Sequence, residues 1–322
     1  MKFFRVLMDG VPRLGKANDD LVSGRLYPDG LDAFDVLARP SAVADGEHVD
    51  FLAAELLPPL DVTTIRDFIT FEQHTVGALR SVAPDKGLPA AWYDAPAFYF
   101  TNPHAATGHN STVALAPGSQ QFDFELEVAA IIGTDGYNLS PEEAEDHIAG
   151  YIIMNDWSAR DLQRHEMTVG LGPTKGKDTA TSLGPVFVTK DEFDDVTEGG
   201  FMNLQMSVSI NGQVLATDSL ANMAWNFPEL ISYASRGTWV RRGDVLGSGT
   251  CGGGCLAEMW GWAGSMTPEP LQRDDVVSLT VERLGTLTNF IGEAAPVHEI
   301  PRARRRPFTP PVPYAPAQET AR

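Results

Sequence analysis

The stretch FDFELEVAAIIG, residues 122–133, constrains the fold more than any other part of the chain. Its apolar density predicts a buried β-strand, and its second half carries no charge. Side chains two positions apart lie on the same face of a strand, so Asp123, Glu125 and Glu127 would share one face. Like charges side by side repel, and burying them is costly unless something compensates. The acidic face is therefore either solvated, as on one side of an antiparallel sheet, or it holds a cation.

The composition limits the classes of partner. Of the 322 residues, 43% are hydrophobic and 21% charged, which is ordinary for a globular protein with a core. The net charge is -19, with 43 acidic and 24 basic residues. Binding to nucleic acid or to an anionic membrane needs a basic surface, so neither is expected as a partner. Bound cations would offset part of the acidic excess.

The chain has only two cysteines, Cys251 and Cys255, in the segment CGGGC. This favours two free thiols in a reducing cytosol, with a local disulfide or a pair of soft-metal ligands as the alternatives. The apolar start of the chain is too short for a signal peptide, and no apolar window is long enough to span a bilayer. The sequence therefore predicts a cytoplasmic protein.

The chain divides into three segments by composition. Residues 1–60 are predicted to form a small N-terminal domain, and residues 61–300 alternate short apolar strands with Gly/Pro loops in a larger catalytic domain. Residues 301–322, rich in Pro and Arg, are predicted to form an extended arm. Because strands outnumber helices, the predicted fold class is α+β, mostly β.

Local signals predict one hairpin and two helices. In SVSINGQVLA, the Asn-Gly pair between two apolar runs predicts a tight hairpin. SPEEAEDHIAG predicts a helix in which Ser140 caps the N-terminus and Pro141 occupies the first turn. NFPELISYAS predicts a second helix. His109, in the polar loop NPHAATGHN, is predicted to have a structural or rim role.

Four acidic residues lie in segments that are otherwise predicted to be structured: Asp67, Glu125, Glu127 and Asp156. If they converge, they form an all-oxygen site. Mg²⁺, Mn²⁺ and Ca²⁺ take such ligands, whereas zinc prefers nitrogen and sulfur. Without a cation, the clustered carboxylates would raise one another's pKa.

Three blocks, DFELEVAAIIG, IAGYIIMNDWSARDLQ and GPTKGKDTATSLGPVFV, follow one another in an order that resembles the fumarylacetoacetate hydrolase (fumarylacetoacetase) family. The resemblance covers roughly residues 61–290 and is weaker over the first 60 residues. It implies a mixed β-sandwich roll as the catalytic domain. It also implies a homodimer and a divalent cation as cofactor, with Mg²⁺ foremost and Mn²⁺ or Ca²⁺ as alternatives.

The resemblance also implies roles for individual residues. The metal ligands would be Asp67, Glu125, Glu127 and Asp156. His74, seven residues after Asp67, would be the catalytic base, and Glu258 would orient it. Lys177, Arg160 and Gln163 would hold the oxyanion. The substrate contacts would be Tyr99, Thr250 and Arg80.

These roles imply a hydrolase that cleaves a C–C bond in a small 1,3-diketo or 2,4-diketo acid of the fumarylacetoacetate or acylpyruvate type. The chain has Ile69 and Met167 where fumarylacetoacetase has tyrosines, which indicates a less polar acyl group. The same metal chemistry serves decarboxylation or isomerisation of keto acids, of the oxaloacetate or 2-hydroxyhepta-2,4-diene-1,7-dioate type, and this is the alternative. A cation-binding scaffold without catalysis is the third reading; it would not need His74, Glu258 and Lys177 together.

Overall fold

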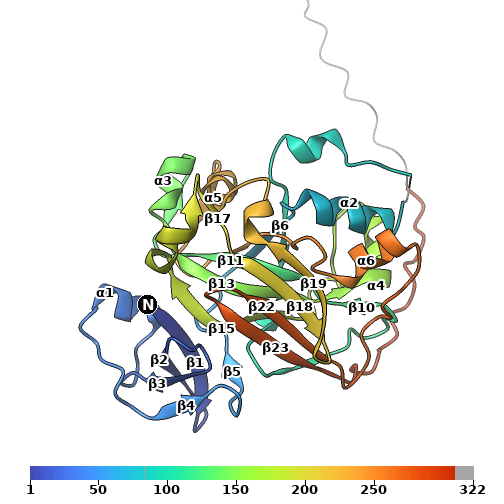
Figure 1. Ribbon diagram of the computed structural model, residues 1–322. Helices are drawn as coiled ribbons and strands as arrows, with labels where there is room; N and C mark the ends of the chain where they lie inside the picture. Colours follow the sequence, from blue (N-terminus) through green and yellow to red (C-terminus); the bar gives the residue numbers. More distant parts are fainter. Residues whose placement is uncertain (84, 309–322) are drawn as a thin grey trace, which may run out of the picture.

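The computed structural model describes residues 1–83 and 85–308, and a large mixed β-sheet runs through it (Figure 1). The strands of this sheet are β1 (Lys2–Met8), β2 (Val11–Ala17), β3 (Ser23–Leu26), β4 (His48–Asp50), β5 (Leu56–Leu57), β6 (Ile65–Phe68), β7 (Phe98–Thr101), β8 (Ala106–Thr107), β11 (Leu126–Ile132), β13 (Ile148–Asp156), β15 (Thr181–Thr189) and β21 (Val245–Gly247). They pair in the order β4-β3-β2-β1-β15-β13-β11-β21-β6-β7, with β5 beside β1 and β8 beside β15.

A second sheet packs on the first. It contains β9 (Thr112–Ala114), β18 (Gln205–Ile210), β19 (Gln213–Ser219), β22 (Val276–Val281) and β23 (Gly285–Gly292), in the order β19-β18-β22-β23-β9. Strand β22 contacts β13, and β23 contacts β15. The turn between β18 and β19 has positive φ at Asn211 (52°) and Gly212 (78°), as a type I′ hairpin requires. The predicted hairpin is therefore confirmed.

Short elements complete the fold. The remaining strands are β10 (Phe122–Asp123), β12 (Gly136–Tyr137), β14 (Ser158–Ala159), β16 (Thr197–Glu198), β17 (Phe201–Met202) and β20 (Trp239–Val240). The helices are α1 (Ala33–Ala38), α2 (Glu72–Arg80), α3 (Pro141–Glu145), α4 (Arg160–Met167), α5 (Phe227–Ser235) and α6 (Leu256–Ala263), with 3-10 turns at Ala90–Tyr93, Pro103–Ala105, Lys190–Val196 and Leu220–Asn222.

The two predicted helices are confirmed as α3 and α5. Ser140 caps α3 and Asn226 caps α5, each in a capping box with the glutamate three residues later. Helix α3 is shorter than predicted because the chain enters β13 already at Ile148.

The strand predicted over residues 122–133 is interrupted. It forms β10 and β11, with Phe124 and Glu125 between them outside any strand. The backbone N–H of Glu125 donates to the side-chain oxygen of Asn155 (2.9 Å), and β10 pairs with β14 instead of continuing beside β13. The prediction that Asp123 shares a strand face with Glu125 and Glu127 is therefore wrong. Both faces of β11 are buried, which excludes a solvated acidic face.

Residues 1–60 form β1–β5 and α1, and they extend the main sheet because β1 pairs antiparallel with β15. The ring of Phe3 stacks on Phe187 of β15, with 5.8 Å between ring centroids. The boundary at residue 60 stays a prediction. Of the predicted C-terminal arm, residues 301–308 are exposed and lie outside helices and strands, and residues 309–322 lie outside the described part of the chain. Among the described residues, no helix combines the length and apolar character that crossing a membrane requires.

Candidate active site

Helices α2 and α6 approach each other closely because two glycines meet at their crossing. A Cβ on Gly261 would lie 1.9 Å from the carbonyl oxygen of Gly77, and a Cβ on Gly77 would lie 2.3 Å from Cγ of Glu258. A larger residue at Gly261 would have to displace the backbone of α2, and one at Gly77 would have to displace the side chains of Glu258 and Trp262. This contact brings His74 of α2 to Glu258 of α6, with 3.6 Å between Nδ1 and Oε2.

The carboxylate of Glu258 is held in place by its neighbours. It accepts hydrogen bonds from the backbone N–H of Gly253 (2.6 Å), from Gln73 Nε2 (3.2 Å) and from Trp262 Nε1 (3.2 Å). Burial alone would raise the pKa of Glu258, but the interactions with His74, with the Gly253 N–H and with Trp262 together lower it. Glu258 is therefore an ionised and oriented partner for the His74 ring.

Four carboxylates meet at neighbouring strands of the main sheet. Asp67 lies on β6, Glu127 on β11 and Asp156 at the end of β13, while Glu125 precedes β11. Each offers an oxygen within 4.8 Å of the oxygens of the other three, and all four side chains are buried. The structure thus brings together all four predicted metal ligands, which we call the carboxylate group.

The carboxylate group fits a hard divalent cation. Within the described residues, Oδ1 of Asp67 and Oδ1 of Asp156 are buried without a hydrogen-bond partner. Burial, followed by repulsion from the other carboxylates, raises the pKa of Asp67 well above its usual value, and the pKa values of Glu127 and Asp156 are also raised, chiefly by burial. A Cβ on Gly247 would lie 2.7 Å from Glu127 Oε2 and 2.9 Å from Asp67 Oδ1. Glycine at this position of β21 keeps the space beside these oxygens open.

Two basic side chains line the other side of the carboxylate group. Lys177 Nζ donates to Glu125 Oε2 and to Asp156 Oδ2 (2.6 Å), and Arg160 forms an ion pair with Glu125 Oε1 (2.7 Å). Burial would raise the pKa of Glu125, but Lys177 and Arg160 together hold it below its usual range. Gln163 Oε1 accepts from Arg160 Nη1 (3.2 Å), which fixes the amide next to the guanidinium.

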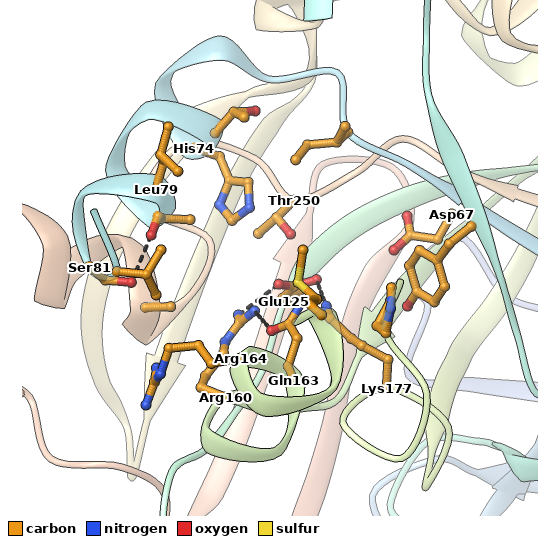
Figure 2. Close-up of a pocket in the computed structure, with 18 of the residues that line it drawn as sticks. Asp67, His74, Leu79, Ser81, Glu125, Arg160, Gln163, Arg164, Lys177 and Thr250 are labelled. Atoms are coloured by element: carbon orange, nitrogen blue, oxygen red, sulfur yellow. Dashed lines mark hydrogen bonds and ion pairs between the residues drawn. The ribbon is translucent and has the colours of Figure 1, made fainter. Parts of the chain in front are cut away.

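Six of these side chains line one cavity of about 490 Å³: Asp67, His74, Glu125, Arg160, Gln163 and Lys177. In Figure 2, His74 points from α2 toward Glu125 and Arg160, with Asp67 and Lys177 on the far side. Polar and apolar side chains both line the cavity. Its apolar lining comes from Phe68, Ile69, Ala78, Leu79, Val82, Ala97, Phe98, Met167, Pro173 and Ala257.

The predicted substrate contacts have different surroundings. Tyr99 and Thr250 line the cavity; the Tyr99 hydroxyl donates to Asp156 Oδ2 (2.5 Å), and the Thr250 hydroxyl donates to Glu127 Oε1 (3.4 Å). Arg80 lies outside the cavity lining, with its guanidinium 4.9 Å from the centre of the Trp262 ring. The contact of Arg80 with substrate stays a prediction.

Sequence reasoning missed several lining residues. Thr75, Leu79 and Val82 line the cavity and are spaced by about one helical turn each, at α2 and just after its end. This spacing could have been used to find Leu79 and Val82 from the sequence, starting from the catalytic assignment of His74. Arg164 lies one helical turn after Arg160, so both side chains are on the face of α4 that lines the cavity. Cys255 approaches His74 Nδ1 to 3.7 Å, and no spacing in the sequence indicates that contact.

A family model matches most of the chain. The model described as "Fumarylacetoacetate (FAA) hydrolase C-terminal" matches residues 63–291, which is most of the chain. The chain belongs to the fumarylacetoacetate hydrolase family. The predicted family and the predicted fold class are both confirmed.

Individual relatives carry several activities in their names. The chain is 32% identical over 214 residues to the oxaloacetate tautomerase YisK of Bacillus subtilis, and the match covers 66% of each protein, a little under two thirds. A fumarylacetoacetate hydrolase from Exiguobacterium antarcticum superposes with a TM-score of 0.67 at 27% identity, covering 91% of this chain and 99% of that one. A 2-hydroxyhepta-2,4-diene-1,7-dioate isomerase from Mycobacterium marinum shares the fold, with a TM-score of 0.65 at 21% identity over 91% of this chain and 98% of that one.

Proposed function

We propose that the protein is a divalent-metal-dependent enzyme that interconverts the keto and enol forms of a small 2-keto acid bearing a second carbonyl group two carbons away. The observation that carries the proposal is the carboxylate group beside Lys177 and Arg160, at a cavity that both basic residues line together with Asp67 and Glu125. The name of the tautomerase relative supports the same reaction type. Oxaloacetate has this arrangement of carbonyl groups and is the first substrate to test.

The residues that would hold the cation are Asp67, Glu125, Glu127 and Asp156, and Mg²⁺ or Mn²⁺ suits this all-oxygen set. When bound, the cation supplies Lewis-acid chemistry that stabilises negative charge on a carbonyl oxygen. Lys177 and Arg160 add fixed positive charge beside the carboxylate group, where it would also stabilise negative charge on a substrate oxygen.

The proton transfer falls to the pair of His74 and Glu258. His74 lines the cavity, and Glu258 lies 3.6 Å behind it. The imidazole would take a proton from the carbon between the two carbonyl groups and return it to an oxygen of the same substrate. Gln163 has its amide oxygen engaged by Arg160, which leaves its N–H donors for a substrate oxygen.

Hydrolysis of a C–C bond is the second candidate function, and the same pair favours it. A histidine backed by an ionised glutamate can deprotonate water as well as carbon. The apolar part of the cavity, with Leu79, Val82 and Met167, would accommodate the acyl group of an acylpyruvate. The resemblance to the family also supports a homodimer, which size-exclusion chromatography with light scattering would test.

The discriminating experiment follows the ultraviolet absorbance of the enol for oxaloacetate, a series of acylpyruvates and fumarylacetoacetate. Each reaction is run with Mg²⁺ or Mn²⁺ and again with a chelator, and the products are identified by mass spectrometry. A metal-dependent acceleration of keto–enol equilibration over the enzyme-free reaction with the same metal, without fragments, supports the isomerase. Two carboxylic acids formed from each substrate with the addition of water overturn it in favour of the hydrolase. Release of carbon dioxide indicates a decarboxylase, and no turnover of any substrate contradicts all of these activities.

The His74→Ala variant tests the proton-transfer assignment. Removing a general base lowers turnover by about 10²–10⁴-fold. Binding of Mn²⁺, measured by electron paramagnetic resonance, should not change, because His74 is not part of the carboxylate group. The matched control is His165→Ala, at an exposed position on α4. Turnover within threefold of the natural protein would show that another residue moves the proton.

A further inference from the structure

A second set of metal-ligating side chains adjoins the carboxylate group. His74, Glu125 and Cys255 each offer a ligand atom within 4.8 Å of the other two, and all three side chains are buried. They come from α2, from the segment before β11 and from the residue that caps α6. This set shares Glu125 with the carboxylate group. Its other two ligand atoms are a nitrogen of His74 and the sulfur of Cys255.

Sulfur and nitrogen donors select a different class of metal ion. A Cys–His–carboxylate set suits Zn²⁺, whereas four carboxylates suit Mg²⁺ or Mn²⁺. With ordinary Zn–S and Zn–N bond lengths and tetrahedral angles, a sulfur and a nitrogen on one zinc ion lie about 3.5 Å apart. The distance between Cys255 Sγ and His74 Nδ1 is 3.7 Å, so these two ligands need little movement.

The surrounding structure holds these ligands in position. The contact between Gly77 and Gly261 fixes α2 against α6, and therefore fixes His74 against Cys255 at the start of α6. Glu125 Oε1 is now paired with Arg160, but Arg160 also pairs with Asp123 at 2.8 Å. The guanidinium thus keeps an anionic partner when that glutamate oxygen turns to a metal ion.

We propose that Cys255, His74 and Glu125 form a zinc site that inhibits the enzyme. Zn²⁺ replaces the thiol proton of Cys255, which leaves to solvent, and forms a bond to the thiolate sulfur. His74 is then a metal ligand and no longer accepts a proton from substrate, and Glu125 is withdrawn from the carboxylate group. Binding at this site depends only on the three side chains, whereas the inhibition rests on the proposed function.

Cobalt(II) tests the site by spectroscopy and needs no activity. The full-length protein is stripped of metal and titrated with Co²⁺. We expect a near-ultraviolet thiolate-to-cobalt charge-transfer band at one equivalent, displaced by Zn²⁺. The Cys255→Ser variant should lose the band, while Cys251→Ser should keep it. Cys251 is the matched control because it is equally buried, lies four residues earlier and does not belong to the set.

Two further measurements keep the test decisive if Cys255→Ser folds poorly. In His74→Ala, the band should persist with at least tenfold weaker Co²⁺ binding, because sulfur remains and nitrogen is lost. In active protein, Zn²⁺ should inhibit in the presence of excess Mg²⁺, and Cys255→Ser should need at least tenfold more Zn²⁺. A band that is absent from the natural protein, retained in Cys255→Ser or unaffected in His74→Ala would overturn the site. Absence of turnover with the band present would contradict the proposed function alone.

Discussion

Asp123 and the carboxylate group are all buried acids, but their surroundings differ. Asp123 accepts hydrogen bonds from the backbone N–H groups of Leu256 (2.8 Å) and Ala257 (2.9 Å) at the start of α6 and from Arg160 Nε (2.8 Å). Its negative charge is balanced, and both oxygens are used. In the carboxylate group, Asp67 and Asp156 each retain a buried oxygen without a partner in the part of the chain that the structure describes.

The difference shows that burial alone does not mark a functional acid. A buried carboxylate with a full set of donors stabilises the fold, since its desolvation is repaid by hydrogen bonds. Buried carboxylates that lack donors destabilise the protein until a cation arrives. The comparison therefore predicts opposite effects of neutralising the two kinds of acid.

The largest effect is expected for Asp123→Ala. Removing one partner of a buried ion pair leaves Arg160 and the N–H groups of α6 uncompensated, which costs about 3–5 kcal/mol. Urea unfolding in the presence of a chelator measures the loss, with the exposed Asp146→Asn as control. A loss below about 1 kcal/mol would mean that Asp123 and the carboxylate group do not differ in kind.

His109 extends the comparison to a buried base. It is kept neutral: burial lowers its pKa to about 4, and its Nδ1 accepts the backbone N–H of Thr288 (3.1 Å). The unfolded chain, with a histidine pKa near 6.5, binds the proton first, so this contribution is complete above about pH 6.5 and is lost as the pH falls toward 4. The loss amounts to about 3 kcal/mol, since each unit of pKa corresponds to about 1.4 kcal/mol.

The measurement for His109 is the difference in unfolding free energy between the natural protein and His109→Asn, followed from pH 7 to pH 4. Asparagine retains an acceptor near the position of Nδ1 but does not titrate. The variant should lose less stability over this range than the natural protein does. Parallel pH curves would show that His109 is protonated in the fold as easily as in the unfolded chain.

Adding the cation should stabilise the protein through the carboxylate group. At a free Mn²⁺ concentration of 100 times Kd, the gain is about 2.7 kcal/mol if the unfolded chain does not bind the ion. Thermal unfolding at a series of Mn²⁺ concentrations measures it, and Asp67→Asn should abolish the response while Asp146→Asn retains it. An undiminished response in Asp67→Asn would place the ion elsewhere.

The smallest effect sharpens the contrast with Asp123 because its sign is reversed. Without metal, Asp67→Asn should raise the free energy of unfolding, since it removes an acid whose pKa burial and neighbouring carboxylates raise. The gain should grow as the pH rises above the ordinary aspartate pKa near 3.9, because the unfolded chain ionises there before the buried carboxyl does. Urea unfolding in the presence of a chelator measures the change in the free energy of unfolding. A variant less stable than the natural protein would contradict the claim that Asp67 destabilises the metal-free protein.

Local signals in the sequence predict part of this structure well. The Asn211–Gly212 hairpin and the Ser140 cap depend on neighbours within a few residues, and both are confirmed. The convergence of Asp67 with Glu127 follows from the resemblance to the fumarylacetoacetate hydrolase family, and the strands that bring them together are separated only by β21.

The break between β10 and β11 could not be predicted in this way. It depends on Asp123 turning to the start of α6, 133 residues later in the chain, and on Asn155 accepting the N–H of Glu125. The placement of Arg80 on Trp262 likewise depends on how α2 crosses α6. Such contacts arise from tertiary packing, which a strand or helix pattern does not encode.

The crossing of α2 and α6 has a consequence for anyone who mutates this protein at random. Gly77 and Gly261 are not among the residues that line the cavity, yet a methyl group at Gly77 would collide with the Glu258 side chain and one at Gly261 with the backbone of α2. Libraries built to alter specificity should therefore hold these two glycines constant while varying Leu79 and Val82 on the cavity wall. Loss of activity after a change at Gly261 would report a displaced helix and would say nothing about which substrates the cavity accepts.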